Sequence, residues 1–229
     1  DPEMSRGLGD VYKRQVLVLG ILPMLPQMSM QISAAENAAS VFVDGVELHA
    51  GSQEYFKNGD TADSGATGTY EDHSAYYDTA GELWLNNLEA HTIKADGNLI
   101  IYVCNNQATN TNIVTATQNE TAIEVTGYLT IRYGGYGGGT GSLTVESDGK
   151  EAIQAGSGMT VSDGVEVKAR AKSGATAISS GGVLKIDGIR TKLEAAGDGS
   201  TGKGIFAQQS VYCLLYTSPS PRDISGYRM

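Results

Sequence analysis

A small residue followed by isoleucine recurs along the second half of the chain. Successive pairs are separated by 30, 30, 25 and 27 residues, and they are Thr92-Ile93, Ala122-Ile123, Ala152-Ile153, Ala177-Ile178 and Gly204-Ile205. A repeat of this length is typical of solenoids, propellers and arrays, in which one repeat buries its apolar face only by stacking on the next. This periodicity constrains the fold more than any other feature of the chain.

Two further short strands follow each pair. The second strand of each unit reads NLIIYV, YLTIR, MTVS or VLKID, and the third reads NIVTA, SLTVES, VEVKAR or TKLEAA. Three strands per unit, separated by Gly, Asp-Gly and Ser-Gly, predict the coils of a right-handed parallel β-helix over residues 92–211. A β-sandwich also uses many short strands, but the phase of the repeat disfavours it. A propeller blade needs roughly 40 residues or more, which exceeds this period.

Residues 36–91 precede the repeat and contain eleven acidic residues and one basic residue, Lys57. The phrase SVFVDGVELHA alternates apolar and polar residues around Asp44-Gly45, which predicts a hairpin with its turn at that dipeptide. Residues 59–75 have no apolar periodicity and indicate a loop. A strand pattern then resumes, with Leu83, Leu85 and Ile93 as expected inward positions. We expect this region to form a hairpin and loop cap on the β-helix.

Both ends of the chain differ in composition from the rest. Residues 5–15 read SRGLGDVYKRQ and residues 213–223 read CLLYTSPSPRD. With permitted codons, the reverse complement of DNA encoding the first segment encodes the second, and that DNA resembles the transposase adapter used for short-read sequencing. We therefore expect residues 1–15 and 212–229 to be adapter-derived, and residues 16–211 to be a piece of a longer protein.

This expectation changes the charge and cysteine counts. The full chain has 16 Lys and Arg, 26 Asp and Glu and a net charge of −10. Without Arg6, Lys13, Arg14, Arg222, Arg228, Asp1, Glu3, Asp10 and Asp223, 11 basic and 22 acidic residues remain, a net charge of −11. Such an acidic chain is poorly suited to nucleic acid. Cys104 is then alone, which indicates a small buried hydrophobe rather than half of a disulfide.

Residues 16 to about 28 form an apolar run that is too short to span a bilayer, and Ser33-Ala34-Ala35 follow it. This pattern is typical of a secretory signal peptide that has lost its basic start. A buried core segment is the alternative, which Pro23 and Pro26 disfavour. We expect residues 16–35 to be an export signal and the mature protein to be secreted or on the cell surface. Membrane contact is expected only through export or anchoring.

A family resemblance rests on the phrases YYDTAGELWLNNLEAHTI, GNLIIYV, AIEVTGYLTIR, GSLTVES and AIQAGSGMTVSDG. Together they resemble the secreted β-solenoid, carbohydrate-binding domain-containing surface proteins of anaerobic Gram-positive gut bacteria. Tyr77-Asp78 and the LWLNN phrase keep the family pattern, whereas Tyr128 replaces the aspartate of its GDLTI phrase. The resemblance covers residues 40–211. It implies a surface location and glycan contact, and it transfers no catalytic residues.

The phrase RYGGYGGGTGS, residues 132–142, is rich enough in glycine to predict an outward loop. Its Arg132, Tyr133 and Tyr136 are candidate ligand-binding residues, because aromatic rings and a guanidinium can together hold a sugar ring. The alternative is a flexible turn whose tyrosines cover apolar neighbours.

Other chemistry has weaker support. The three histidines are far apart, and no nucleophile elbow, phosphate-binding loop or zinc-type cysteine set occurs in the sequence. The six Asp-Gly pairs could suggest calcium, but each coil needs turns of this composition. The acids Glu124 and Glu146, or Asp148 and Glu151, could approach one another as a catalytic pair, although solvated surface acids are the simpler interpretation. We expect no metal, no cofactor and no catalytic residue.

These observations favour a non-catalytic fragment of a secreted or surface β-solenoid protein that serves in adhesion or in binding a polysaccharide or cell-surface glycan. The alternatives are a structural stalk that displays a distal domain, and the N-terminal part of a pectate-lyase-like polysaccharide lyase or hydrolase. The last coil ends without a cap, so we also expect an aggregation-prone open end. We expect residues after Tyr212 not to continue the solenoid in register.

Overall fold

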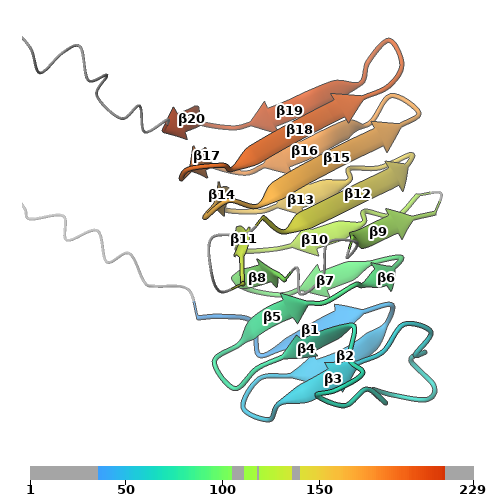
Figure 1. Ribbon diagram of the computed structural model, residues 1–229. Coiled ribbons are helices and arrows are strands. Elements are labelled where there is room, and N and C mark those ends of the chain that lie inside the picture. The colour runs from blue at the N-terminus through green and yellow to red at the C-terminus, as the bar shows by residue number, and fades with distance from the viewer. Residues whose placement is uncertain (1–35, 105–110, 118, 136–139, 215–229) are drawn as a thin grey trace, which may run out of the picture. The chain divides into compact units, whose positions relative to one another are not determined.

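The computed structural model describes residues 36–104, 111–117, 119–135 and 140–214. Within these ranges the chain forms strands and turns without any helix, so none is present that could cross a membrane. The strands assemble into three sheets that make three faces of a stacked solenoid, as Figure 1 shows. The adapter-like segment 5–15, the export segment expected at 16–35 and most of the C-terminal adapter-like segment lie outside the described residues.

The seven-stranded sheet contains β19 (Lys203–Ala207), β16 (Thr176–Ser180), β13 (Ile153–Ala155), β10 (Ile123–Val125), β7 (Ile93–Ala95), β1 (Ser40–Val43) and β2 (Val46–His49), in that order. The eight-stranded sheet contains β20 (Val211–Leu214), β17 (Leu184–Asp187), β14 (Gly158–Ser162), β11 (Tyr128–Tyr133), β8 (Leu99–Val103), β5 (Glu82–Leu85), β4 (Ala75–Tyr77) and β3 (Glu54–Phe56). The five-stranded sheet contains β18 (Lys192–Gly197), β15 (Glu166–Lys172), β12 (Ser142–Asp148), β9 (Asn112–Ala116) and β6 (Glu89–Ala90).

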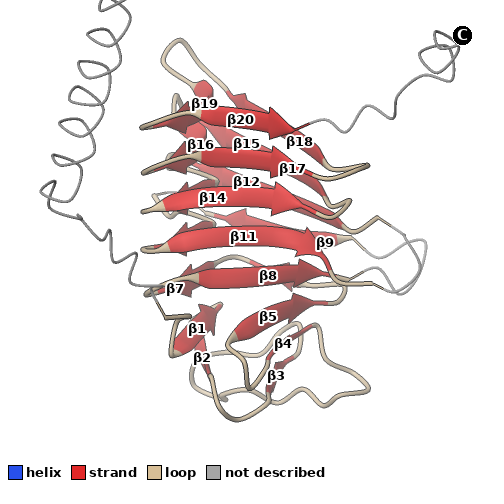
Figure 2. Cartoon of the chain, turned by 90° about the vertical axis from the view of Figure 1, so that its left-hand side faces the viewer, coloured by secondary structure: helices blue, strands red, loops and turns tan. Residues whose placement is uncertain are grey.

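Four complete coils of three strands can be followed through the described residues. They are β7–β8–β9 (coil 1), β10–β11–β12 (coil 2), β13–β14–β15 (coil 3) and β16–β17–β18 (coil 4). Neighbouring coils pair in parallel, and Figure 2 shows the strands of the eight-stranded sheet lying as successive rungs. The predicted parallel β-helix is therefore confirmed.

The recurring isoleucines stack directly on one another. Ile93 pairs with Ile123, Ile123 with Ile153, Ile153 with Ile178 and Ile178 with Ile205. The first four are fully buried. Ile123, Ile153 and Ile178 each lie between the equivalent isoleucines of two neighbouring coils, and Ile93 lies between Ile123 and Val43 of the cap. Strands such as β12 alternate half-buried and buried residues, which places one face of each strand in a continuous core. The repeat is thus the sequence signature of this stack.

The N-terminal end of the stack is covered by antiparallel strands. β1 and β2 form the predicted hairpin, with Asp44 and Gly45 at φ values of 50° and 80°. β1 also pairs antiparallel with β7, and β4 joins β3 to β5 in the same way. The buried Tyr77 hydroxyl donates a hydrogen bond to the carbonyl of Ala38, 2.5 Å away. These contacts include the expected hairpin at the N-terminal end of the described stack.

The C-terminal end differs from our expectation in one respect. β20 pairs in parallel with β17 as far as Leu214, so the ladder continues through Tyr212 and Cys213. The prediction that the register stops after Tyr212 is therefore wrong. A parallel ladder is made by backbone groups, so the short apolar run Val-Tyr-Cys-Leu can extend it whatever its origin. All four residues of β20 are exposed, and no further coil covers them within the described residues.

Candidate functional site

The structure describes two of the three residues predicted to form a sugar-binding platform. Arg132 and Tyr133 belong to β11 rather than to an outward loop. Because side chains alternate along a strand, Arg132 lies on the outer face of the sheet, whereas Tyr133 packs against the hydrophobic core. Tyr136 lies outside the described residues. Arg132 and Tyr133 therefore do not share one platform, and Arg132 belongs to a different outward group.

That group is a row of side chains on the outer face of the eight-stranded sheet. Tyr55 pairs with Tyr76, Tyr76 with Trp84, Trp84 with Tyr102 and Tyr102 with Arg132. We call these five residues the aromatic row. It crosses β3, β4, β5, β8 and β11, the lower strands of the sheet that faces the viewer in Figure 2. Since adjacent strands lie roughly 4.8 Å apart, residues in register on one face are brought into contact.

The rings of the row stack on one another. Trp84 lies parallel to Tyr76 on one side and to Tyr102 on the other, with ring centroids 5.7 and 4.0 Å apart. The guanidinium carbon of Arg132 lies 4.5 Å from the centroid of the Tyr102 ring, which places a cation at the end of the stack. At the other end of the row, the ring centroids of Tyr55 and Tyr76 lie 5.9 Å apart. Both faces of Trp84 are therefore covered, and the row presents ring edges outward.

His73 and Tyr70, both in the cap, extend the aromatic row at its Tyr55 end. The ring centroid of His73 lies 5.0 Å from that of Tyr76, 5.6 Å from that of Tyr55 and 5.9 Å from that of Tyr70. Tyr70 is 69% exposed, the largest exposed fraction among the tyrosines of this extended row. This end of the row therefore offers an accessible ring surface.

Polar groups line the edge of the row. The Trp84 indole donates a hydrogen bond to the Asp78 carboxylate at 3.0 Å, and Asp78 also accepts from the backbone N–H groups of Ala80 and Glu82. The Glu82 carboxylate accepts from the Tyr102 hydroxyl at 3.4 Å and lies 3.8 Å from the Arg132 guanidinium. Arg132 in turn donates to the Tyr102 hydroxyl. These contacts hold donors and acceptors in fixed positions.

Burial affects the chemistry of the row. It raises the pKa of Tyr76 to about 12 and also raises the pKa of Tyr102, although Arg132 acts on Tyr102 in the opposite direction. Both hydroxyls therefore remain protonated at neutral pH. The Arg132 Nε atom is buried and has no hydrogen-bond partner among the described residues. A buried donor without a partner is costly, so this atom lowers the stability gained from the row.

The connections beside the row are longer than their counterparts in later coils. Eight residues join β8 to β9 and eight join β11 to β12, whereas three join β14 to β15 and four join β17 to β18. Parts of both long connections lie outside the described residues. Gly134 begins the second of them next to the row, where an added Cβ would lie 2.9 Å from Tyr102 and 3.1 Å from Trp84. Insertions in a solenoid commonly occur on its binding face.

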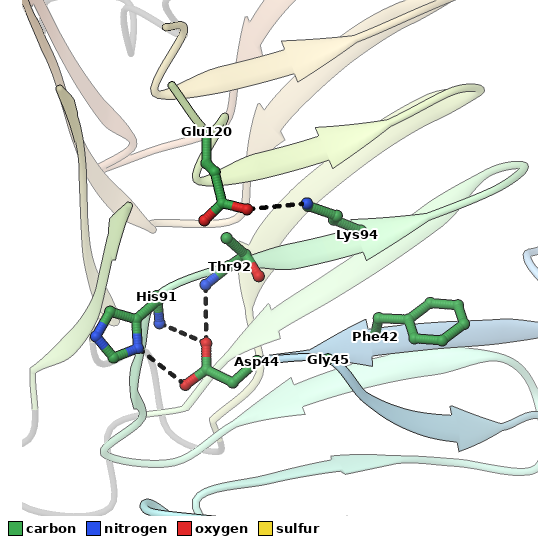
Figure 3. Close-up of a pocket in the computed structure, with 7 residues that line it drawn as sticks. All are labelled: Phe42, Asp44, Gly45, His91, Thr92, Lys94 and Glu120. Carbon is green, nitrogen blue, oxygen red and sulfur yellow. Dashed lines mark hydrogen bonds and ion pairs between the residues drawn. The ribbon is translucent and has the colours of Figure 1, made fainter. Parts of the chain in front are cut away.

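Apart from the aromatic row, a hollow lies on the seven-stranded sheet, where the cap meets coils 1 and 2. It has a volume of about 400 Å³ and is lined by Phe42, Asp44, Gly45, His91, Thr92, Lys94 and Glu120, as Figure 3 shows. The Asp44 carboxylate accepts hydrogen bonds from the backbone N–H groups of His91 and Thr92, at 2.6 and 2.9 Å. Above these, Lys94 forms an ion pair of 3.7 Å with Glu120. Asp44 thereby fixes the hairpin turn to coil 1.

The remaining sequence candidates are dispersed. Glu124 lies on the seven-stranded sheet and Glu146 on the five-stranded sheet, so the two strands do not bring them side by side. The glycines of all six Asp-Gly pairs have positive φ, between 80° and 113°, which confirms the interpretation of these pairs as turns. Burial raises the pKa of the Cys104 thiol to about 11. No group of three or more His, Cys, Asp or Glu side chains placed to hold a metal occurs within the part of the chain that the structure describes.

Sequence reasoning missed the aromatic row. Its signal was an aromatic residue flanked by inward-facing apolar residues in three separate strands, at Tyr76, Trp84 and Tyr102. Tyr102 and Arg132 are also one 30-residue repeat apart. Protein-family models, curated proteins and solved structures contain no match to this chain. The function is therefore inferred from the residues themselves.

Proposed function

We propose that this protein binds a polysaccharide without chemically altering it, and that the aromatic row is the binding surface. The observation that carries the proposal is the alignment of four rings and a guanidinium on one outer face, beside the two longest connections between the strands of a coil. The sequence resemblance and the pattern at residues 16–35 add the proposal that the protein works outside the cell or on its surface.

The chemistry of the row suits a chain of sugars. Ring edges carry partial positive charge and attract sugar oxygens, while the Arg132 guanidinium donates to hydroxyls and the Glu82 carboxylate accepts from them. Because Tyr102 and Glu82 already hold Arg132 in place, little side-chain freedom is lost when a ligand arrives. The row also runs across the strands, so an extended polymer could contact several rungs at once.

A structural stalk is the second candidate function, and the same stacking favours it. Both faces of the Trp84 ring are filled by neighbouring rings, which stabilises the sheet whether or not a ligand binds. The two functions differ in what happens when the polar end of the row is removed. A binding surface loses affinity, whereas a stalk loses only part of its stability.

Affinity electrophoresis in gels that contain β-glucan, mannan or arabinoxylan separates these functions. We expect retardation of the protein in at least one gel, and the double variant Tyr102→Ala, Arg132→Ala should weaken it by at least about tenfold. Tyr128→Phe is the matched control, since Tyr128 is on β11 and bonds Thr160 outside the row. Circular dichroism should show that both variants remain folded. Migration unaffected by every polysaccharide would favour the stalk.

A further inference from the structure

Three adjoining hollows follow coil 1 across the junction with the cap. The hollow of Figure 3 shares Phe42 and Lys94 with a second one of about 240 Å³, which Ala95, Asp96, Glu124 and Thr126 complete. It shares His91 with a third one of about 570 Å³, whose lining includes Thr115 and Thr117. We call this surface the junction groove. It lies along residues 89–96, on a side of the solenoid different from the aromatic row.

Phe42 lies in the middle of the junction groove, and its ring stacks on no other aromatic ring among the described residues. It is 38% exposed and lines two of the three hollows. Its backbone is held on both sides, since β1 pairs with β2 and with β7. Phe42 therefore presents an accessible aromatic ring from a fixed backbone, which the aromatic row lacks at its centre.

Hydrogen-bonding groups of both kinds surround this ring. Lys94 is the cross-strand neighbour of Phe42, and Glu124 is in register with Lys94 on the next coil. Lys94 and Glu120 are 3.7 Å apart with side chains 42% and 46% exposed, so their ion pair is loose and can exchange for ligand contacts. The walls are fixed, because Asp96 accepts a hydrogen bond from the Thr126 hydroxyl at 2.7 Å.

We propose that the junction groove is a second carbohydrate-binding site, which takes a neutral pyranose on the Phe42 ring. The apolar face of the sugar packs on the ring, Lys94 donates to one hydroxyl, and Glu120 and Glu124 accept from its neighbours. A free strand edge, which an extended peptide would need, is missing here because β1, β7 and β10 are each paired on both sides. A sugar chain needs no free strand edge, because its hydroxyls can form hydrogen bonds with side chains alone.

A consequence is that one chain carries two glycan sites on different faces. It can then join two polysaccharide strands, and joint engagement strengthens adhesion beyond either site alone. The second site shares its ligand class with the proposed function of the aromatic row but uses none of the residues of that row. The two proposals can therefore fail independently.

Equilibrium dialysis with labelled cellohexaose, mannohexaose and laminarihexaose tests the second site. We expect the hexasaccharide that binds to do so at two sites per chain, with one remaining in Phe42→Ala and in the pair Lys94→Ala, Glu124→Gln. The remaining site should disappear when Tyr102→Ala and Arg132→Ala are added. Gln154→Ala is the matched control, because Gln154 is in register with Glu124 one coil further along and lines none of the three hollows.

The outcomes distinguish the two sites. One binding site per chain that Phe42→Ala leaves unchanged would overturn the junction groove and keep the aromatic row. One site that Phe42→Ala abolishes would support the groove and overturn the row. A lack of binding by all three hexasaccharides would overturn the junction groove, whereas the aromatic row is tested separately by the polysaccharide gels.

Discussion

The first two coils and the last two share one interior and differ on the outside. In coils 1 and 2 the outer positions of the eight-stranded sheet include Tyr102 and Arg132, and eight-residue connections follow their strands. In coil 3 the same row continues with Ser162, and the connections in coils 3 and 4 shorten to three and four residues. The inward isoleucines keep one register throughout. Fold is thus specified by the inner face, while function is proposed to reside on the outer face of a few coils.

The two ends of the stack also differ in how well they are covered. Val41, Leu48 and Phe56 of the cap are fully buried. The corresponding last layer leaves Ile205 and Val211 37% and 51% exposed. Alternation along a strand therefore selects the inward face, but only the next layer removes that face from water.

The largest expected effect comes from truncating a leucine to alanine in coil 2 and, for comparison, in coil 4. Leu129 is fully buried in coil 2, so Leu129→Ala should lower the free energy of unfolding by about 2–5 kcal/mol. Leu193 in β18 is only partly buried, so Leu193→Ala should lower the free energy of unfolding by less than about 1 kcal/mol. Urea denaturation measures both. Equal losses would mean that the last coil is as well covered as the second.

The two cysteines allow the same comparison of covered and open regions through their thiol reactivity. Burial raises the pKa of Cys104 to about 11 from an ordinary value of 9.0, whereas Cys213 on β20 is exposed. At pH 8 the thiolate population of Cys104 should be about 100-fold below that of an ordinary thiol, so iodoacetamide should label Cys213 first. Mass spectrometry of the labelled peptides measures the rates, and guanidinium chloride should remove the difference. Similar rates in the folded protein would contradict the protection that the partial burial of Cys104 should give.

The cap can be tested through Tyr77. Tyr77→Phe removes the hydrogen bond to the Ala38 carbonyl and should cost about 1–2 kcal/mol of unfolding free energy. Burial raises the pKa of Tyr77 to about 12 from 10.0, so the folded state holds this proton more tightly. Its contribution to stability is therefore complete below about pH 10 and declines as the pH rises towards 12. Denaturation across this range should show a shallower alkaline decline for Tyr77→Phe, and an unchanged slope would refute the assignment.

The smallest expected effect concerns association through the open end. Val211 and Phe206 are exposed, and the outer edges of their strands have no partner among the described residues. The protein should therefore self-associate as its concentration rises. Val211→Lys should reduce this association, while Ser179→Lys, on the preceding rung, should leave it unchanged. Sedimentation velocity at several concentrations measures both. A monodisperse monomer at every concentration would show that the open end does not drive self-association.

Much of the fold could be predicted from the sequence. The small-Ile pairs identified the stacking register, and Asp44-Gly45 identified the hairpin, because both patterns are local and short-range. The end of the ladder was misplaced, since backbone pairing depends little on side-chain identity at β20.

The candidate site was harder to predict for a physical reason. Tyr55, Tyr76 and Trp84 belong to antiparallel strands of the cap, whose spacing does not follow the repeat, so only pairing in three dimensions aligns them with Tyr102. The expected partnership of Arg132 with Tyr133 failed because β11 continues through both residues and turns them to opposite faces. The junction groove likewise depends on the hairpin meeting coil 1.

The most direct test of the aromatic row as a binding surface uses Trp84, the only tryptophan of the chain. Its ring lies at the centre of the row, so its fluorescence reports on that surface alone. Titration with the polysaccharide that retards the protein should change the Trp84 emission saturably, and Tyr102→Ala with Arg132→Ala should abolish the change. Binding of that polysaccharide with no change in Trp84 emission would contradict the assignment of the row as the binding surface.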